Sequence, residues 1–317
     1  MCGLFGFSSY GDQSIKDLSL LTNSLARQAS VRGTDATGIA YVRSGYIHIL
    51  KEAKEAQKIK FKHPEDIKAL IGHTRHSTQG SEKKNYNNHP FLGKTKNERF
   101  ALAHNGVLFN DDVLKKTFQF PHTRIETDSY VAVQLIEHKK KLDMESIKFM
   151  AEEIDGSFTF CLLDNGNNLY LVKGDNPLSI IHFPRLKLYI YASTDDILFK
   201  AIINSPLLSE LKSKEYDEII VNEGDILKIT SDGKIEKATY NYCRYFGKQW
   251  WQYGSPYRHT TFQTPAKTDN ATMSYINELK TYALYEGIEP KQIDELLQAG
   301  MTLEEVEEYI YAYEGYY

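Results

Sequence analysis

The cysteine at position 2 directly follows Met1, and this position could give its thiol a chemical role. Cysteine is small, so removal of Met1 would expose Cys2 as the mature amino terminus. The α-amine of such a residue has a pKa of about 7.7 to 8.0 and can take the thiol proton directly or through a water molecule. Position 2 is equally compatible with a cysteine that only packs. Cys2 is therefore a candidate nucleophile whose support must come from the rest of the chain.

Further polar and glycine-containing segments follow in a fixed order. With the first segment they are MCGLFG (1–6), RGTDATG (32–38), GHTRHSTQG (72–80), NHPF (88–91), HNG (104–106) and TDS (127–129). Taken singly, each has a plain structural interpretation. Arg75 at a strand end could face solvent, and Asp128 could only cap a helix. The six motifs are informative because they occur together and in order.

This ordered set resembles the class II glutamine amidotransferases, whose glutaminase domains are amino-terminal-nucleophile (Ntn) hydrolases. The resemblance covers residues 2–240 and does not extend to the tail. It implies an α+β fold, a four-layer αββα sandwich with a small helical C-terminal extension in this chain. It also implies hydrolysis of L-glutamine to glutamate and ammonia through a thioester on Cys2, with no cofactor.

The resemblance gives roles to matching residues. The side-chain amide of Asn105 and the backbone N–H of Gly106 would form the oxyanion hole, in which each donor contributes about 10²- to 10³-fold in rate. Arg75 would bind the substrate carboxylate through a bidentate fork, and Asp128 would bind the ammonium group. Thr78 matches a position that contacts the substrate. Together these groups would select a free amino acid.

Other matching positions would support the nucleophile or cover the substrate. Arg32, Asp35 and His89 would order the surroundings of Cys2. The segment 76–84 matches a mobile loop that closes over glutamine. His76 stands where an aromatic residue is usual, and residues 87–88 are Asn-Asn where Asn-Ala is frequent. These departures predict altered loop packing, with the chemistry retained.

The remaining histidines and cysteines do not indicate a metal site. His73, His76, His89 and His104 could suggest one, but no HExxH motif or Cys/His cluster accompanies them. Cys161 and Cys243 lie in apolar and aromatic runs and are predicted to pack inertly.

The elements that must position these residues are mainly short apolar runs, which predict strands. The predicted strands are 3–7, 37–42, 46–50, 70–74, 100–104, 157–163, 169–173, 178–183, 188–192, 218–221, 225–230 and 234–239. Hairpin turns are expected at 44–45 and 164–167. Helices are expected at 15–25, at 131–138 after a Thr127-Asp128 cap, at 144–153, and after Ser193-Thr194. Sheets with segregated helices favour an α+β layered architecture.

The composition agrees with a globular chain that has one large or two ordinary domains. The 317 residues are 41% hydrophobic and 25% charged. No spanning segment or secretory signal is evident, so we expect a cytoplasmic protein without membrane contact. A net charge of −4 gives no reason to expect nucleic acid as a partner.

Beyond the glutaminase region (2–240), we predict an aromatic and polar linker at 241–270 and a small helical tail at 271–317. Tail helices are expected at 275–285, 290–298 and 302–313, the last opened by a capping box at Thr302. This segment is short for an acceptor domain and has no GxxxxGK[ST] phosphate loop. We therefore expect the ammonia acceptor to be a synthetase or transferase on another protein. The tail could dock that partner or pack on its own domain.

Two alternatives remain open from the sequence. One is an Ntn amidase that acts on a γ-glutamyl compound, which keeps the same free α-groups as glutamine. The other is a non-catalytic module that retains the fold. Retention of Met1 would block the amine and would favour the second alternative.

Overall fold

The computed structural model describes residues 2–11, 17–242, 276–277, 279–280, 283–284 and 288–298, with residues 301, 303, 306 and 310. The chain divides into two compact units, Met1–Gln252 and Tyr253–Tyr317. Each unit is described by itself.

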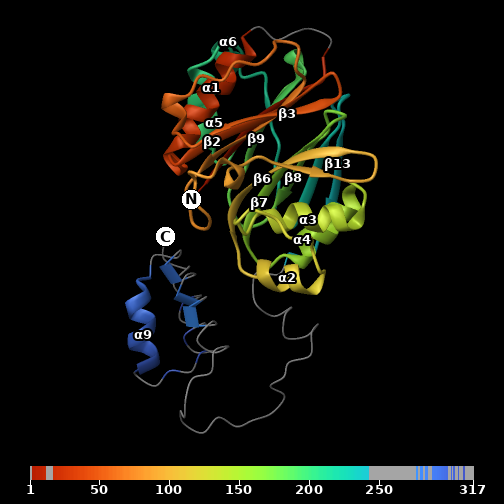
Figure 1. Ribbon diagram of the computed structural model, residues 1–317. Coiled ribbons are helices and arrows are strands. Elements are labelled where there is room, and N and C mark those ends of the chain that lie inside the picture. Colours follow the sequence, from red (N-terminus) through yellow and green to blue (C-terminus); the bar gives the residue numbers. More distant parts are fainter. Residues whose placement is uncertain are drawn as a thin grey trace. The chain divides into compact units, whose positions relative to one another are not determined.

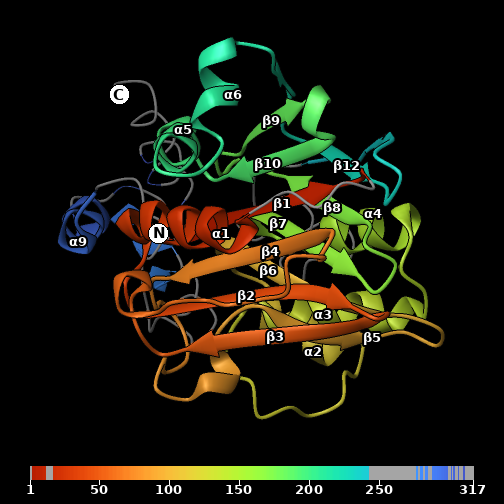
Figure 2. The ribbon, with the colours of Figure 1, turned by 90° about the horizontal axis from the view of Figure 1, so that it is seen from above.

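Sheet A of the first unit has seven strands. In spatial order they are β11 (Asp217–Glu218), β9 (Ser179–Phe183), β10 (Leu188–Ala192), β1 (Gly3–Ser9), β4 (Ala69–Arg75), β2 (Ala36–Arg43) and β3 (Tyr46–Glu52) (Figure 2). Neighbouring strands all pair antiparallel. The first strand of the chain is thus the central strand of this sheet, and it brings Cys2 to the end of β4.

Sheet B has six strands. Their order is β13 (Ile235–Thr239), β12 (Asp225–Ile229), β8 (Leu169–Lys173), β7 (Gly156–Asp164), β6 (Arg99–Leu108) and β5 (Phe91–Lys94). These strands also pair antiparallel throughout. The hairpins β2–β3 and β7–β8 turn where the sequence predicts.

Helices cover the outer face of each sheet, which gives four layers (Figure 1). Sheet A carries α1 (Leu18–Ala29), α5 (Asp195–Ile203) and α6 (Leu208–Ser213), and sheet B carries α2 (Asp111–Thr117), α3 (Tyr130–Lys139) and α4 (Met144–Glu153). Short 3₁₀ turns are η1 (Ser30–Arg32), η2 (Ala56–Lys58), η3 (Asn85–Asn87) and η4 (Pro184–Leu186). The α+β layered fold is therefore confirmed.

Strand alternation explains how the sheets are buried on both faces. In β1, Phe5 and Phe7 pack toward α1, whereas Leu4 packs between the two sheets with Ile71 of β4 and Leu171 of β8. Successive side chains of a strand point to opposite faces, so a strand buried on both sides is mostly apolar on both faces. This is why the strand runs lack an alternating polar pattern.

Several local predictions were wrong. The sequence analysis missed β5, α2 and α6, which are only four to seven residues long. The strand expected at 218–221 is the two-residue β11. Asp128 does not cap α3, because the N-cap is Ser129 and the Asp128 carboxylate instead accepts the backbone N–H of Leu108 at 2.7 Å.

The second unit contains helical residues between 276 and 284, helix α9 (Pro290–Gln298), and helical positions at 303, 306 and 310. Leu279, Ile293, Val306 and Ile310 are buried, whereas Leu284 is exposed. Lys280 pairs with Asp294 of α9 at 2.5 Å. The boundaries 241–270 and 271–317 stay predictions, and Cys243, the aromatic linker from 243 and the Thr302 capping box lie outside the described residues.

Within the part of the chain that the structure describes, no helix combines the length and the apolar character needed to cross a membrane.

Candidate active site

Cys2 lies one residue before β1, where the backbone of the neighbouring strand surrounds its thiol. Its Sγ is 3.4 Å from the backbone nitrogen of His76 and 3.5 Å from the His76 carbonyl oxygen. Arg32 Nε donates to the Cys2 carbonyl at 2.7 Å. The side chain is partly exposed. Arg32 thus fixes the backbone of Cys2.

Asp35 orders the chain just after β4. Its Oδ2 accepts the backbone N–H of Ser77 at 2.7 Å, and its own N–H donates to the carbonyl of Arg75 at 3.0 Å. Both contacts direct the chain that leaves β4 back toward Cys2. Arg32 thus contacts the backbone of Cys2, and Asp35 contacts Ser77 and Arg75 on either side of His76. Their supporting roles stay predictions.

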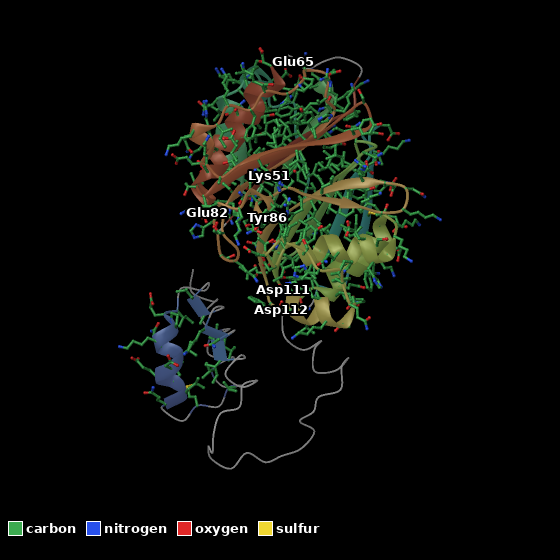
Figure 3. All side chains as sticks on the ribbon, viewed as in Figure 1. Lys51, Glu65, Glu82, Tyr86, Asp111 and Asp112 are labelled. Atoms are coloured by element: carbon green, nitrogen blue, oxygen red, sulfur yellow. The ribbon has the colours of Figure 1, made fainter. Side chains whose placement is uncertain are left out.

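Arg75 is buried at the end of β4, and its guanidinium holds the loop between β4 and β5 (residues 76–90). It donates to Asn88 Oδ1 at 2.7 Å and to the carbonyls of Gln79 and Gly80 at 2.6 and 2.8 Å. These contacts use three of its five N–H groups. The guanidinium therefore organises the loop as well as facing the site, a double role that the sequence does not indicate. Glu82 and Tyr86 mark this loop in Figure 3.

Asp128 is buried and held by three different groups. Its Oδ2 accepts from Leu108 N–H, and its Oδ1 accepts from Ser129 Oγ at 3.1 Å. Its backbone N–H donates to Gln79 Oε1 at 3.0 Å. Burial raises the pKa of Asp128, and these hydrogen bonds and the charge of Arg75 oppose that rise. The carboxylate is therefore fixed in position, and a nearby cation favours its charged form.

Arg75 and Asp128 act electrostatically on the Cys2 thiol. Burial raises the pKa of Cys2, while the His76 N–H and the charge of Arg75 lower it and the charge of Asp128 raises it. Burial lowers the pKa of Arg75, and the negative charges of Cys2 and Asp128 oppose that change. A thiol, a cation and an anion therefore lie close enough to influence one another, which suits a zwitterionic ligand.

Asn105 and Gly106 lie on β6, beside this region. Asn105 is fully buried, and neither its Nδ2 nor its Oδ1 has a hydrogen-bond partner. Gly106 has φ 141°, and a Cβ there would lie 1.8 Å from the carbonyl oxygen of Ser157. A larger residue is excluded at 106. An unpartnered buried amide costs about 1 to 3 kcal/mol, so it is a group that a ligand would satisfy.

Thr78 and His89 differ in their surroundings. Thr78 is exposed in the 76–90 loop, where its hydroxyl can reach a ligand only if the loop moves over it. His89 is buried between the rings of His73 (4.2 Å) and Phe91 (4.3 Å), and neither ring nitrogen has a partner. Burial holds the pKa of His89 well below its usual range. His89 is thus a neutral packing group behind the site.

Among the described residues, no group of three or more His, Cys, Asp or Glu side chains could hold a metal ion. His73 and His104 are buried, and burial lowers the pKa of each to about 3. They therefore stay neutral.

Several supporting residues escaped the sequence analysis. Asn88 and Gln79 hold Arg75, while Ser129 holds Asp128. Lys51 of β3 donates to the carbonyls of Asn88 and Pro90, and burial together with the charge of Arg75 lowers its pKa to about 8. Gln79, Asn88 and Ser129 carried a signal, because they stand inside recognised motifs, whereas Lys51 stands outside them.

Comparison with known proteins agrees with this geometry. Residues 73–200 match the model of the glutamine amidotransferase domain family. The matched segment includes Arg75, Asn105, Gly106 and Asp128. The chain contains a class II glutamine amidotransferase domain.

Among curated relatives of this amidotransferase domain are isomerizing glutamine–fructose-6-phosphate aminotransferases. That of Bacillus thuringiensis subsp. konkukian is 34% identical over 188 residues, which are 57% of this chain and 30% of the relative. That of Listeria innocua is 34% identical over 242 residues, or 74% of this chain and 36% of the relative. The chain thus spans about a third of the length of these relatives.

Solved structures show the same fold. Glutamine phosphoribosylpyrophosphate amidotransferase of B. subtilis, in complex with ADP and GMP, has a TM-score of 0.59 at 22% identity. The match covers 75% of this chain and 49% of that chain. The two antiparallel sheets of the amidotransferase domain therefore correspond to those of an established Ntn-hydrolase amidotransferase.

Proposed function

We propose that the amidotransferase domain hydrolyses L-glutamine to glutamate and ammonia, with Cys2 as nucleophile after removal of Met1. The observation that carries this proposal is electrostatic. Arg75 and Asp128, one cation and one anion, both act on the thiol of Cys2. Free glutamine carries the complementary pair of charges on its α-carbon and a neutral amide at the other end.

In this proposal the α-amine of Cys2 takes the thiol proton, and the thiolate attacks the side-chain amide carbon of glutamine. The Nδ2 group of Asn105 and the N–H of Gly106 donate to the oxygen of the tetrahedral intermediate. The protonated amine then gives its proton to the leaving nitrogen, and ammonia departs. Water hydrolyses the remaining thioester with the same amine as base, which releases glutamate.

Substrate selection in this proposal depends on Arg75, Asp128 and Thr78. Arg75 binds the α-carboxylate through the N–H groups that the loop leaves free, and Asp128 binds the α-ammonium. A peptide-bonded glutamine lacks these charges, so it would offer no counter-charge to Arg75 or Asp128 and would bind less well. Free glutamine is therefore preferred.

Ammonia is proposed to pass to an acceptor enzyme on another chain. The names of the relatives describe a transfer of nitrogen from glutamine to fructose 6-phosphate, and the match covers only the smaller part of each relative. The segment 241–317 contains no phosphate-binding motif of the form GxxxxGK[ST]. The acceptor and the product of the transfer are left to biochemical identification.

The test uses protein whose cysteine amino terminus is confirmed by intact mass. Wild-type protein should release glutamate from glutamine, and Cys2→Ser should abolish that release while circular dichroism stays unchanged. A glutamine-analogue diazoketone should label Cys2 and spare Cys161, whose pKa burial raises to about 12.

Cys161→Ala serves as the matched control and should keep full labelling. Turnover that survives Cys2→Ala, or labelling that follows Cys161, would refute the assignment of the nucleophile. Faster cleavage of a γ-glutamyl anilide than of glutamine would instead favour a γ-glutamyl amidase.

A further inference from the structure

A continuous set of hydrogen bonds reaches Asp128 from the far side of sheet B. His104 is buried on β6, and its ring stacks on Phe160 with centroids 4.6 Å apart. Its Nδ1 lies 2.8 Å from Ser129 Oγ. Ser129 Oγ lies 3.1 Å from Asp128 Oδ1, to which it donates. The imidazole, the hydroxyl and the carboxylate form one chain of hydrogen bonds.

The protons in this chain of hydrogen bonds can be counted. An ionised carboxylate only accepts hydrogen bonds, so the single hydroxyl proton of Ser129 goes to Asp128. The oxygen of Ser129 can then only accept from His104, whose Nδ1 must carry a proton. Burial lowers the pKa of His104 to about 3, so the ring is neutral and carries one proton. A proton on Nδ1 would be donated to Ser129, whereas a proton on Nε2 would be donated to the Ser157 carbonyl, which opposes the pKa shift. The proton count favours the Nδ1–H tautomer, in which Nε2 makes no hydrogen bond.

The backbone of His104 is held as firmly as its ring. The carbonyl oxygen of His104 is 2.9 Å from Nε2 of His73 on β4. Asn105 is the next residue, so this contact ties sheet A to sheet B at the proposed oxyanion donor. One residue is therefore placed to set both the peptide that leads into Asn105 and, through Ser129, the direction of the Asp128 carboxylate.

We propose that His104 and Ser129 are positioning residues that hold the Asp128 carboxylate in the orientation that receives the substrate ammonium. This inference rests on the proposed glutaminase function. Neither residue touches the substrate. Their contribution is to keep Oδ1 of Asp128 from rotating toward other donors. The buried carboxylate is then already oriented to bind the substrate ammonium.

The first experiment compares two substrates. Ser129→Ala should raise KM for glutamine about tenfold, with kcat within about twofold, because one hydrogen bond to the carboxylate is lost. Glutaramate, which is glutamine without its α-amine, makes no use of Asp128. Its kcat/KM should stay within about twofold of the wild-type value. Ser129→Thr retains the hydroxyl and should restore the KM for glutamine. An equal loss for both substrates would show a merely structural role and would overturn the inference.

The second experiment separates the Nδ1–H donor from the ring. His104→Asn keeps an N–H near the Nδ1 position but loses the stacking on Phe160, whereas His104→Phe keeps the stacking and loses the donor. The inference expects His104→Asn to bind glutamine more tightly than His104→Phe by about fivefold or more. The reverse order would contradict it.

The third experiment does not depend on turnover. Nitrogen-15 NMR of histidine-labelled wild-type protein should show His104 as a neutral ring with its proton on Nδ1, and Ser129→Ala should shift that resonance. A proton on Nε2, facing the Ser157 carbonyl, would mean that Ser129 donates to His104 instead of Asp128, and the inference would fail. If the protein proved to have no glutaminase activity, this measurement would still decide the hydrogen-bond arrangement.

Discussion

At the scale of single residues, Asn105 shows the conflict between stability and function. Both polar atoms of its amide are buried and have no partner. Proteins rarely tolerate such a group, because each unsatisfied atom costs about 1 to 3 kcal/mol. A bound ligand that develops negative charge would accept a hydrogen bond from the Asn105 amide and so remove this cost. The unpartnered amide is therefore suited to stabilising a transition state.

Asn105→Ala should lower kcat for glutamine by about 10²- to 10³-fold with little change in KM, because the lost donor acts on the oxyanion. Steady-state kinetics measure both constants. Asn176→Ala provides a comparison, since that buried amide already donates to Ser157 Oγ at 2.7 Å and is expected to affect stability more than kcat. A change in KM alone for Asn105→Ala would remove the oxyanion role.

The sequence predicts that Cys2, Arg75 and Asn105 belong to one site, because each lies in a motif whose order is informative. It could not show that Arg75 uses three N–H groups to bind its own loop, since that depends on how residues 76–90 fold. The helix cap expected at Asp128 was wrong. A carboxylate before a helix usually caps it, and only the tertiary position of Leu108 redirects this side chain.

At the scale of elements, the 76–90 loop is tied to the segment that precedes α3. Asn87 is fully buried and accepts the N–H of Glu126 at 2.9 Å, while its amide donates to Glu126 Oε2 at 2.9 Å and to the Ser81 carbonyl at 3.1 Å. Lys84 forms an ion pair with Glu126. The loop therefore helps to fix the position of Arg75 relative to that of Asp128.

Asn87→Ala should raise KM for glutamine by about tenfold and speed amide hydrogen exchange in residues 77–88, because two hydrogen bonds between the two segments and one within the loop are lost. Lys83→Ala, at an exposed position of the same loop, should change neither quantity. Unchanged exchange in Asn87→Ala would show that other contacts hold the loop.

Long elements were predictable from sequence, and short ones were not. The strands that became β7, β8 and β10 each have at least four consecutive apolar residues, so their pattern is clear. Strand β5 has four residues with Gly93 among them, and α6 buries no residue. Neither has enough apolar periodicity to distinguish it from a loop.

At the scale of the whole molecule, three neutral histidines are buried between the elements of the first unit. Burial lowers the pKa of His73 and His104 to about 3, and that of His89 well below its usual range. The unfolded chain takes up these protons near pH 6.5, whereas the folded chain does not. The unfolded state thus binds more protons in acid, and stability must fall as the pH drops below about 6.5.

The free energy of unfolding should therefore decrease by up to about 4 kcal/mol per pH unit below pH 6, as three histidines each contribute about 1.4. The raised pKa of buried Asp128 works in the opposite direction and offsets part of this slope. Urea unfolding at pH 7, 6 and 5 measures it. His89→Leu should reduce the slope by about a third, and His122→Gln, at an exposed position, should leave it unchanged. A flat profile would contradict neutral burial.

The central place of β1 in sheet A also bears on how the protein is made. Strand β1 is synthesised long before β10, yet the two strands pair at residues 188–192, and the N–H of Leu4 donates to Ser193 Oγ. At about 5 to 20 residues per second, roughly 10 to 40 s of synthesis separate the two strands. Strand β1 therefore lacks one of its two neighbours throughout that interval, and sheet A can be completed only after β10 has been made.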